Sequence, residues 1–141
     1  MSNPASISER PPTADEYLEL IASVGWLPRE RRAVEVALAN SLYAVCAVLD
    51  GRVVGCGRVI GDGGLHLYLT DVVVRPAYQR RGIGTGIVTA LVRYVESVPY
   101  CNLLVAALPT PGLVSFCARH GFEPQSVETP ILQRWVNRTT G

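Results

Sequence analysis

The chain has 141 residues, of which 48% are hydrophobic, and a formal net charge of +1 from 13 basic and 12 acidic residues. This length predicts one globular domain over residues 1–141, and the balanced charge, without long runs of either sign, argues against a nucleic-acid partner. All 13 basic residues are arginine, which excludes a Schiff-base lysine and the lysine of the common phosphate-binding loop.

The four cysteines lie in separate apolar segments, and no C-x-x-C pair occurs. With no secretory leader ahead of them, we expect reduced thiols in a cytoplasmic protein. The longest uncharged apolar stretches are well below the roughly 20 residues that span a bilayer, so no membrane role is expected. His66 and Asp62 make no convincing ligand set, and no metal is expected.

The N-terminal part predicts two helices. Thr13 is a typical N-cap before an acidic first turn, and Gly25 ends the first helix. Pro28 predicts the start of a second helix that continues to about Ala39. Residues 1–12 are polar and proline-rich, so we expect them either to be flexible or to form an edge strand through residues 5–8; residues 137–141 are also expected to be flexible.

The period of the apolar residues changes at residue 42. Three apolar runs, residues 42–49, 52–60 and 65–74, are separated by the turn-forming sequences "DG" and "GDGG". They predict three antiparallel strands in a meander.

The second half predicts helix, strand, helix and strand. Apolar residues recur at helical spacing up to about Ser97, and Pro99 ends that helix. A buried strand over residues 102–108, a short helix over 111–120 and a last strand over 131–136 follow. Together these elements predict an α/β sandwich around a mixed sheet.

The sequence "RPAYQRRGIGTG", residues 75–86, joins the third strand of the meander to the next helix. The first amides of a helix lack backbone partners, and glycines let an anion approach them, so a diphosphate is the expected ligand. Ile87 replaces the last glycine of the dinucleotide-binding motif, and the phosphate-loop lysine is missing. The alternative is a glycine-rich turn with ordinary surface arginines.

Together with "FCARHGFEP" further along the chain, this stretch resembles motifs A and B of the GNAT superfamily of acetyl-CoA-dependent N-acetyltransferases. The resemblance covers roughly residues 42–135. It implies a mixed, mostly antiparallel sheet that is splayed at its centre and flanked by helices on both faces. It also implies that acetyl-CoA is the acyl donor, with its diphosphate on the amides of Arg80 through Thr85 and its pantetheine along the strand before them. The implied donor-binding residues are Val72, Val73, Val74, Gln79, Arg80, Arg81, Gly82, Ile83, Gly84 and Thr85.

Asp71 is the candidate general base, because it interrupts the nearly uncharged run "LHLYLTDVVV". The acceptor amine must lose a proton, and a carboxylate in a central strand could take it through a water molecule. The alternative is that Asp71 pairs with Arg58 of the preceding strand and only stabilises the sheet.

Cys117 stands where motif B of the resembled family carries a tyrosine acid. Three explanations are open: Cys117 donates the proton, another tyrosine such as Tyr78 or Tyr68 does so, or the thiolate leaves without an acid. The commoner outcome for such a cysteine is packing as a small apolar residue.

The resemblance thus implies transfer of an acetyl group to a primary amine, by direct attack in a ternary complex. The acceptor is a small molecule or a peptide or protein amine, and the segment "RERR" at residues 29–32 lies in the region that borders the acceptor groove in such proteins. The alternative, motivated by Cys117, is an acyl-CoA-binding sensor or partner-binding module with weakened chemistry. The apolar C-terminal strand with Trp135 and an exposed sheet edge would suit a homodimer.

Overall fold

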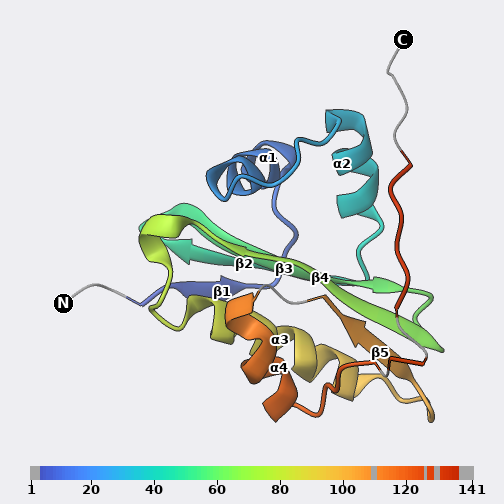
Figure 1. Cartoon of the computed structure of the whole chain (residues 1–141). Coiled ribbons are helices and arrows are strands. Elements are labelled where there is room, and N and C mark those ends of the chain that lie inside the picture. The colour runs from blue at the N-terminus through green and yellow to red at the C-terminus, as the bar shows by residue number, and fades with distance from the viewer. Residues whose placement is uncertain (1–3, 109–110, 126, 129–130, 137–141) are drawn as a thin grey trace.

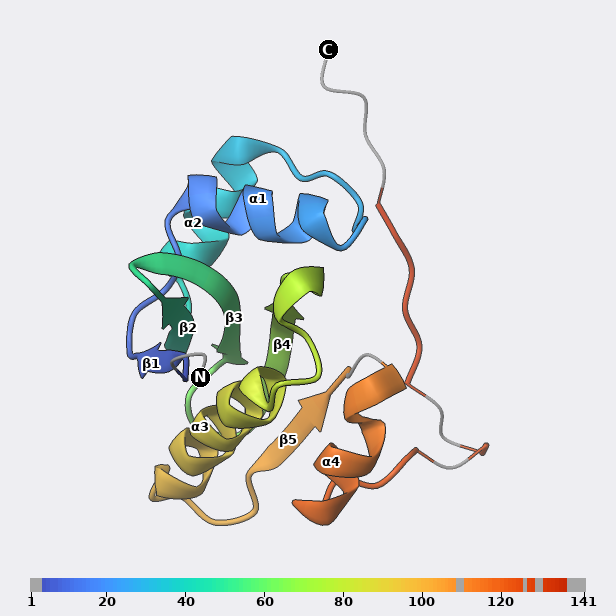
Figure 2. The same cartoon turned by 90° about the vertical axis from the view of Figure 1, so that its left-hand side faces the viewer.

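The computed structural model describes residues 4–108, 111–125, 127–128 and 131–136. Five strands form one sheet in the order β1-β2-β3-β4-β5, with helices on both faces (Figures 1 and 2). All neighbouring strands are antiparallel except β4 and β5, which are parallel. This confirms the predicted mixed α/β fold. The strands are β1 (Ser6–Ser8), β2 (Tyr43–Leu49), β3 (Arg52–Gly61), β4 (His66–Val74) and β5 (Leu104–Ala107).

The meander was predicted correctly by its turn residues. Asp50 and Gly51, between β2 and β3, both have positive φ angles, of 50° and 76°. Such a turn matches the twist of the strands that it joins. At the N-terminus, β1 confirms the edge-strand alternative for residues 6–8. The flexible ends were expected in part at residues 1–3 and 137–141, which lie outside the described residues.

Helices α1 (Ala14–Ser23) and α2 (Arg31–Ala39) lie on one face of the sheet (Figure 1). The Thr13 hydroxyl accepts a hydrogen bond from the amide of Glu16 at 3.1 Å, and the Glu16 carboxylate accepts one from the Thr13 amide at 2.8 Å. This reciprocal cap begins α1 as predicted. The predicted start of α2 at Pro28 is wrong: Glu30 is extended, and its carbonyl accepts the first helical hydrogen bond, from Val34.

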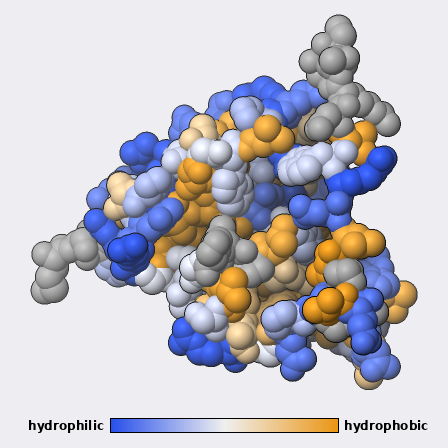
Figure 3. Space-filling view, in the orientation of Figure 1, coloured by the Kyte–Doolittle hydropathy of each residue, from blue (hydrophilic) through white to orange (hydrophobic). Residues whose placement is uncertain are grey.

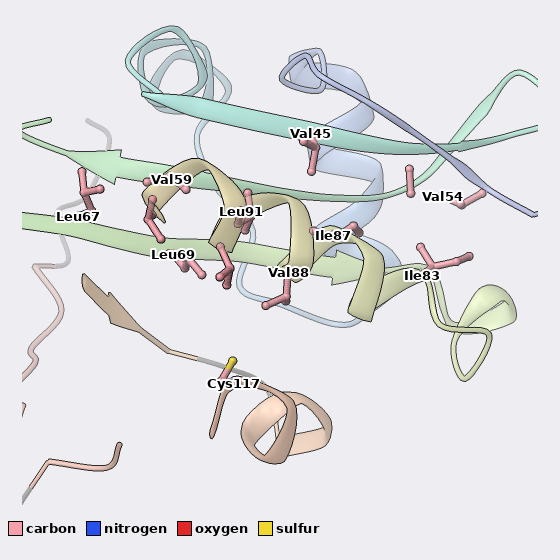
Figure 4. Packing of buried hydrophobic residues seen from close by; sticks show 13 residues of the cluster. Val45, Val54, Val59, Leu67, Leu69, Ile83, Ile87, Val88, Leu91 and Cys117 are labelled. Atoms are coloured by element: carbon pink, nitrogen blue, oxygen red, sulfur yellow. The ribbon is translucent and has the colours of Figure 1, made fainter. Parts of the chain in front are cut away.

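Helix α3 (Ile83–Ser97) packs on the opposite face, where its apolar side chains and those of β2, β3 and β4 form the largest core cluster (Figure 4). Gly57 of β3 permits this close approach. A Cβ atom at that position would lie only 2.5 Å from Cγ2 of Ile87 and 3.1 Å from Cδ1 of Leu91. The sheet therefore carries a glycine where the helix crosses it.

The C-terminal part departs from the sequence-based expectation in two places. Strand β5 is a partly exposed edge and not a buried strand: Leu104 is 58% exposed. The predicted last strand over residues 131–136 is not formed, and this segment runs from the β5 side toward the helix pair without regular structure (Figures 1 and 2). A short apolar segment indicates strand tendency, but a strand also needs a paired edge.

The short helices near the C-terminus are η2 (Pro111–Leu113) and α4 (Val114–Arg119), and Gly121 follows with a φ of 88°, which agrees with the predicted helix end. Hydrophobic surface gathers over β5, α4 and the C-terminal segment at the lower right of Figure 3. Homodimer formation stays a prediction, and the strand on which it partly rested is not present.

Candidate active site

A bulge in β4 sets the geometry of the site. Thr70 is paired with Arg58 and Val73 with Cys56, so two residues of β4, Asp71 and Val72, face one residue of β3. Asp71 takes up the extra residue with a left-handed φ of 56°. The alternation of side chains is interrupted there, and Thr70 and Asp71 consequently line the same pocket.

The Asp71 carboxylate is held by two side chains from other elements. Its Oδ2 atom lies 2.7 Å from Nε of Arg58, and its Oδ1 atom accepts a hydrogen bond from the Tyr17 hydroxyl at 3.0 Å. The Arg58 guanidinium also donates to the carbonyl of Ala37 at 3.0 Å and to the hydroxyl of Ser41 at 3.2 Å. The pairing of Asp71 with Arg58, which was the structural alternative for this residue, is confirmed, and the role as a base stays a prediction.

Tyr17 was missed by the sequence reasoning. Burial and the neighbouring Asp71 carboxylate raise the pKa of its hydroxyl above the ordinary value, so it is a hydrogen-bond donor at neutral pH. The two residues are 54 positions apart. The only signal in the sequence is that Tyr17 stands on the apolar face of α1, beside Leu20 and Ile21, where a polar tip needs a partner.

The pocket in front of Asp71 lies between the helix pair and strands β3 and β4. Its volume is about 210 Å³. The wall is mostly aliphatic, and its ionisable groups are Tyr17, Arg29, Arg58 and Asp71. Of the segment 29–32 that was expected to border the acceptor groove, Arg29 is the residue that lines this pocket. The aliphatic residues are Ala33, Val34, Ala37, Leu38 and Ile60.

The loop between β4 and α3 begins with η1 (Pro76–Tyr78), after which Arg80 and Gly82 take left-handed φ angles of 63° and 80°. The Gln79 side chain donates to the carbonyl of Val74 at 2.9 Å and ties the loop to the strand. The first intrahelical bond of α3 runs from the amide of Gly86 to Gly82. Within the described part of the chain, the six amides from Arg80 to Thr85 have no protein acceptor.

These six amides are suited to an anion. They lie at the positive end of a 15-residue helix dipole. A Cβ atom on Gly82 would meet nothing within 4 Å, so there is open space beside the loop. Arg80 and Arg81 are both exposed, and the Arg81 guanidinium lies over the Tyr78 ring at 5.4 Å.

Strands β4 and β5 separate next to this loop. Their pairing runs from His66 with Leu104 to Leu69 with Ala107. In the described residues, no part of β5 is paired with Thr70–Val74, and Figure 2 shows the two strands diverging. The predicted splay is therefore present, and among the described residues it leaves the stretch of β4 between the amide-lined loop and the Asp71 pocket without a β5 partner.

The structure does not bring Cys117 to Asp71. The Cys117 side chain is 5% exposed and belongs to the core on the α3 face, whereas the Asp71 pocket is on the α1 and α2 face. Burial raises the pKa of the Cys117 thiol. Tyr78 packs at the edge of the same core, and Tyr68 lies on β4, where burial and the Asp71 charge raise its pKa. Packing by Cys117 is thus observed, and the three explanations stay untested: an acid role for Cys117, an acid role for a tyrosine, or departure of the thiolate without an acid.

No group of three or more His, Cys, Asp or Glu in the described part of the chain is arranged to hold a metal ion. The described cysteines are free thiols, of which Cys101 is exposed. None of the described helices is long and apolar enough to cross a membrane. A cytoplasmic location stays a prediction.

A sheet that splays beside an amide-lined turn agrees with the arrangement that the resemblance to the GNAT superfamily implies. The family model described as acetyltransferase (GNAT) family matches residues 10–122, and the chain belongs to this family.

Three known proteins illustrate the relationship. The protein named uncharacterized N-acetyltransferase ycf52 from Pyropia yezoensis is 29% identical over 80% of this chain and 67% of its own length. A protein of unknown function from meticillin-resistant Staphylococcus aureus has a TM-score of 0.86 at 26% identity, covering 94% of this chain and 99% of that one. N-acetylglutamate synthase from Neisseria gonorrhoeae, solved with coenzyme A and L-arginine, shares the fold, with a TM-score of 0.65 at 20% identity, covering 87% of this chain and 28% of that one. The chain spans about two thirds or less of the length of its first curated relatives.

Proposed function

We propose that the protein transfers the acetyl group of acetyl-CoA to a primary amine by direct attack in a ternary complex. The observation that carries this proposal is the set of six amides from Arg80 to Thr85 that lack an acceptor in the described residues. Their number and their place at a helix N-terminus suit the diphosphate of coenzyme A. Family membership and the coenzyme A complex of a protein with this fold support the same ligand.

The stretch of β4 that has no β5 partner in the described residues supports the proposed position of the acyl group. Val72 to Val74 follow the bulge and have no partner in β5 within the described residues. An unpaired amide in this stretch would stabilise the negative charge that develops on the thioester oxygen during amine attack. We propose that Val72, Val73 and Val74 lie along the pantetheine, and that Gln79 holds the loop on the strand.

Asp71 is the proposed proton acceptor on the pocket side. A carboxylate has about four lone-pair positions, and the bonds from Arg58 and Tyr17 use two, so others remain for the acceptor amine or a bridging water. Arg58 also fixes the orientation of the carboxylate. Asp71 therefore orients the amine and takes its proton, and the positive charge of Arg29 beside the pocket favours the neutral amine.

We propose that Cys117 does not protonate the leaving thiolate, since the Cys117 thiol is buried in the core on the α3 face of the sheet. Tyr78 is the tyrosine beside the donor loop and is the candidate acid if one is needed. An acyl-enzyme on Cys117 is not proposed, because its side chain is 5% exposed.

The test is release of coenzyme A from acetyl-CoA over a panel of primary amines. We expect amine-dependent release by the native protein, and a fall of about a hundredfold in kcat/KM on Asp71→Asn, with a changed pH profile. Asp50→Asn is the matched control, because Asp50 also has a left-handed backbone, with a φ of 50°, but lies in the β2–β3 turn. Intact acetyl-CoA binding with no release for any amine would sink the enzymatic proposal.

A further inference from the structure

We infer that the acceptor is a small amine that also carries a carboxylate, as a free amino acid does, and that Arg29 selects it by binding the carboxylate. This inference rests on the proposed function and names the substrate class of the same site. It follows from the size of the pocket, from its uneven charge and from the place of Arg29.

The size of the pocket limits the acceptor. Sites for drug-sized ligands have volumes of about 300–1,000 Å³, whereas a cavity of about 150 Å³ holds a benzene ring. At about 210 Å³, the pocket fits a compact molecule with one ring or one branched chain. Its aliphatic wall, from α2 and β3, favours an apolar body on that molecule.

The charges that line the pocket do not balance. Arg58 and Asp71 form an ion pair at 2.7 Å, and two further hydrogen bonds tie Arg58 to Ala37 of α2 and to Ser41, the second residue after that helix. Arg29 is the second cation of the lining, and among the described residues no carboxylate lies within ion-pair distance of it. One positive charge beside the pocket is thus left for a ligand, and a guanidinium binds a carboxylate with two parallel hydrogen bonds.

Arg29 is exposed, lines the pocket and packs against an aromatic side chain of the C-terminal segment. Its guanidinium carbon lies 4.9 Å from the centre of the Trp135 ring, a contact with the ring face that leaves the N–H edge of the guanidinium available. Burial and the Asp71 charge raise the pKa of Tyr17, and the charges of Arg58 and Arg29 oppose that rise. The positive charge of Arg29 therefore acts on Tyr17, the residue that binds Asp71. The pocket thus offers the Asp71 carboxylate to the amine of the acceptor and the Arg29 guanidinium to its carboxylate.

The experiment compares matched pairs of acceptors, phenylalanine with phenethylamine and leucine with 3-methylbutylamine. In the native protein we expect kcat/KM to be about tenfold or more higher for each amino acid than for its decarboxylated partner. Arg29→Gln should bring this ratio close to one, and Arg29→Lys should keep part of it. Arg52→Gln is the control, since Arg52 is exposed at the start of β3 and does not line the pocket.

A readout without turnover separates this inference from the proposed function. By titration calorimetry, N-acetylphenylalanine should bind the native protein about tenfold more tightly than the Arg29→Gln variant. Equal or better turnover of the decarboxylated amines by the native protein, or a ratio that survives Arg29→Gln, overturns the assignment of Arg29 while acetyl transfer stands. No turnover of any amine, of either kind, contradicts the proposed function itself.

Discussion

Replacing Thr85 with glutamate sets two electrostatic effects against each other at the N-terminus of α3. Thr85 is exposed, is the third residue of the helix and supplies the last of the six amides without an acceptor. A carboxylate in the first turn of a helix stabilises it by about 0.3–1 kcal/mol, because it neutralises the positive end of the dipole. The same carboxylate would lie beside the proposed position of the coenzyme A diphosphate.

The expected loss of binding follows from Coulomb's law. At a separation of about 6 Å and an effective dielectric constant of about 40, one carboxylate and two diphosphate charges repel each other by about 3 kcal/mol before salt screening. Screening at physiological ionic strength reduces this to about 1–2 kcal/mol, which corresponds to a rise in Kd of roughly 5- to 30-fold. The variant should thus be more stable to heat and bind acetyl-CoA more weakly.

The assay is calorimetric titration with acetyl-CoA at two salt concentrations, together with thermal unfolding. Thr85→Gln is the matched control, because it has the same length as glutamate without the charge. The difference in Kd between the two variants should shrink at high salt. Equal Kd values for Thr85→Glu and Thr85→Gln would show that the diphosphate does not lie on these amides and would refute the assignment of the loop.

Three further predictions concern stability and Cys117. Gly57→Ala should lower the free energy of unfolding by about 1–3 kcal/mol, because the new methyl group overlaps Ile87. Gly64→Ala should change it little, because a Cβ atom there meets nothing within 4 Å. Equal effects of the two substitutions in urea unfolding would contradict the close packing of α3 on Gly57. The amides of His66, Gly64 and Leu65 hold the pKa of Asp62 well below 3.8. The Asp62 carboxylate therefore adds to the free energy of unfolding above pH 3.8, and this contribution is lost as the pH falls toward the folded-state pKa. In Asp62→Asn, the free energy of unfolding from urea titrations should depend less on pH between about pH 6 and pH 2. An unchanged pH dependence would contradict this assignment. Cys117→Ala should cost about 1 kcal/mol of stability and keep kcat/KM within about threefold, and a hundredfold loss of activity would give Cys117 the acid role.

Local signals in the sequence were sufficient for the meander and for the amide-lined turn before α3. The pair Asp50 and Gly51 predicts a turn with two positive φ angles, and both are positive. The glycines after Arg81 predict a helix start that an anion can approach, and the unpaired amides are there. In both cases the deciding interactions are made by residues a few positions apart.

The rest of the site depends on contacts between distant residues. Tyr17 reaches Asp71 across 54 positions, and Arg29 joins the pocket from the loop before α2. The bulge that turns Thr70 and Asp71 to the same side changes the register by one residue, which a period-two pattern does not record. The apolar residues of segment 131–136 predict a strand that is not formed, because an apolar pattern indicates burial without saying which sheet edge would pair with it.

Transfer of isotope-labelled acetyl groups in a single turnover tests the central claim most directly. The protein, loaded with 13C-acetyl-CoA, would be mixed with an amine acceptor, and mass spectrometry would locate the label on the amine, the coenzyme or the protein. Direct transfer from acetyl-CoA bound along β4 predicts that the label appears on the amine and never on a cysteine. Label that stays on acetyl-CoA with every amine would contradict the account, and label on Cys117 would replace the ternary complex with an acyl-enzyme.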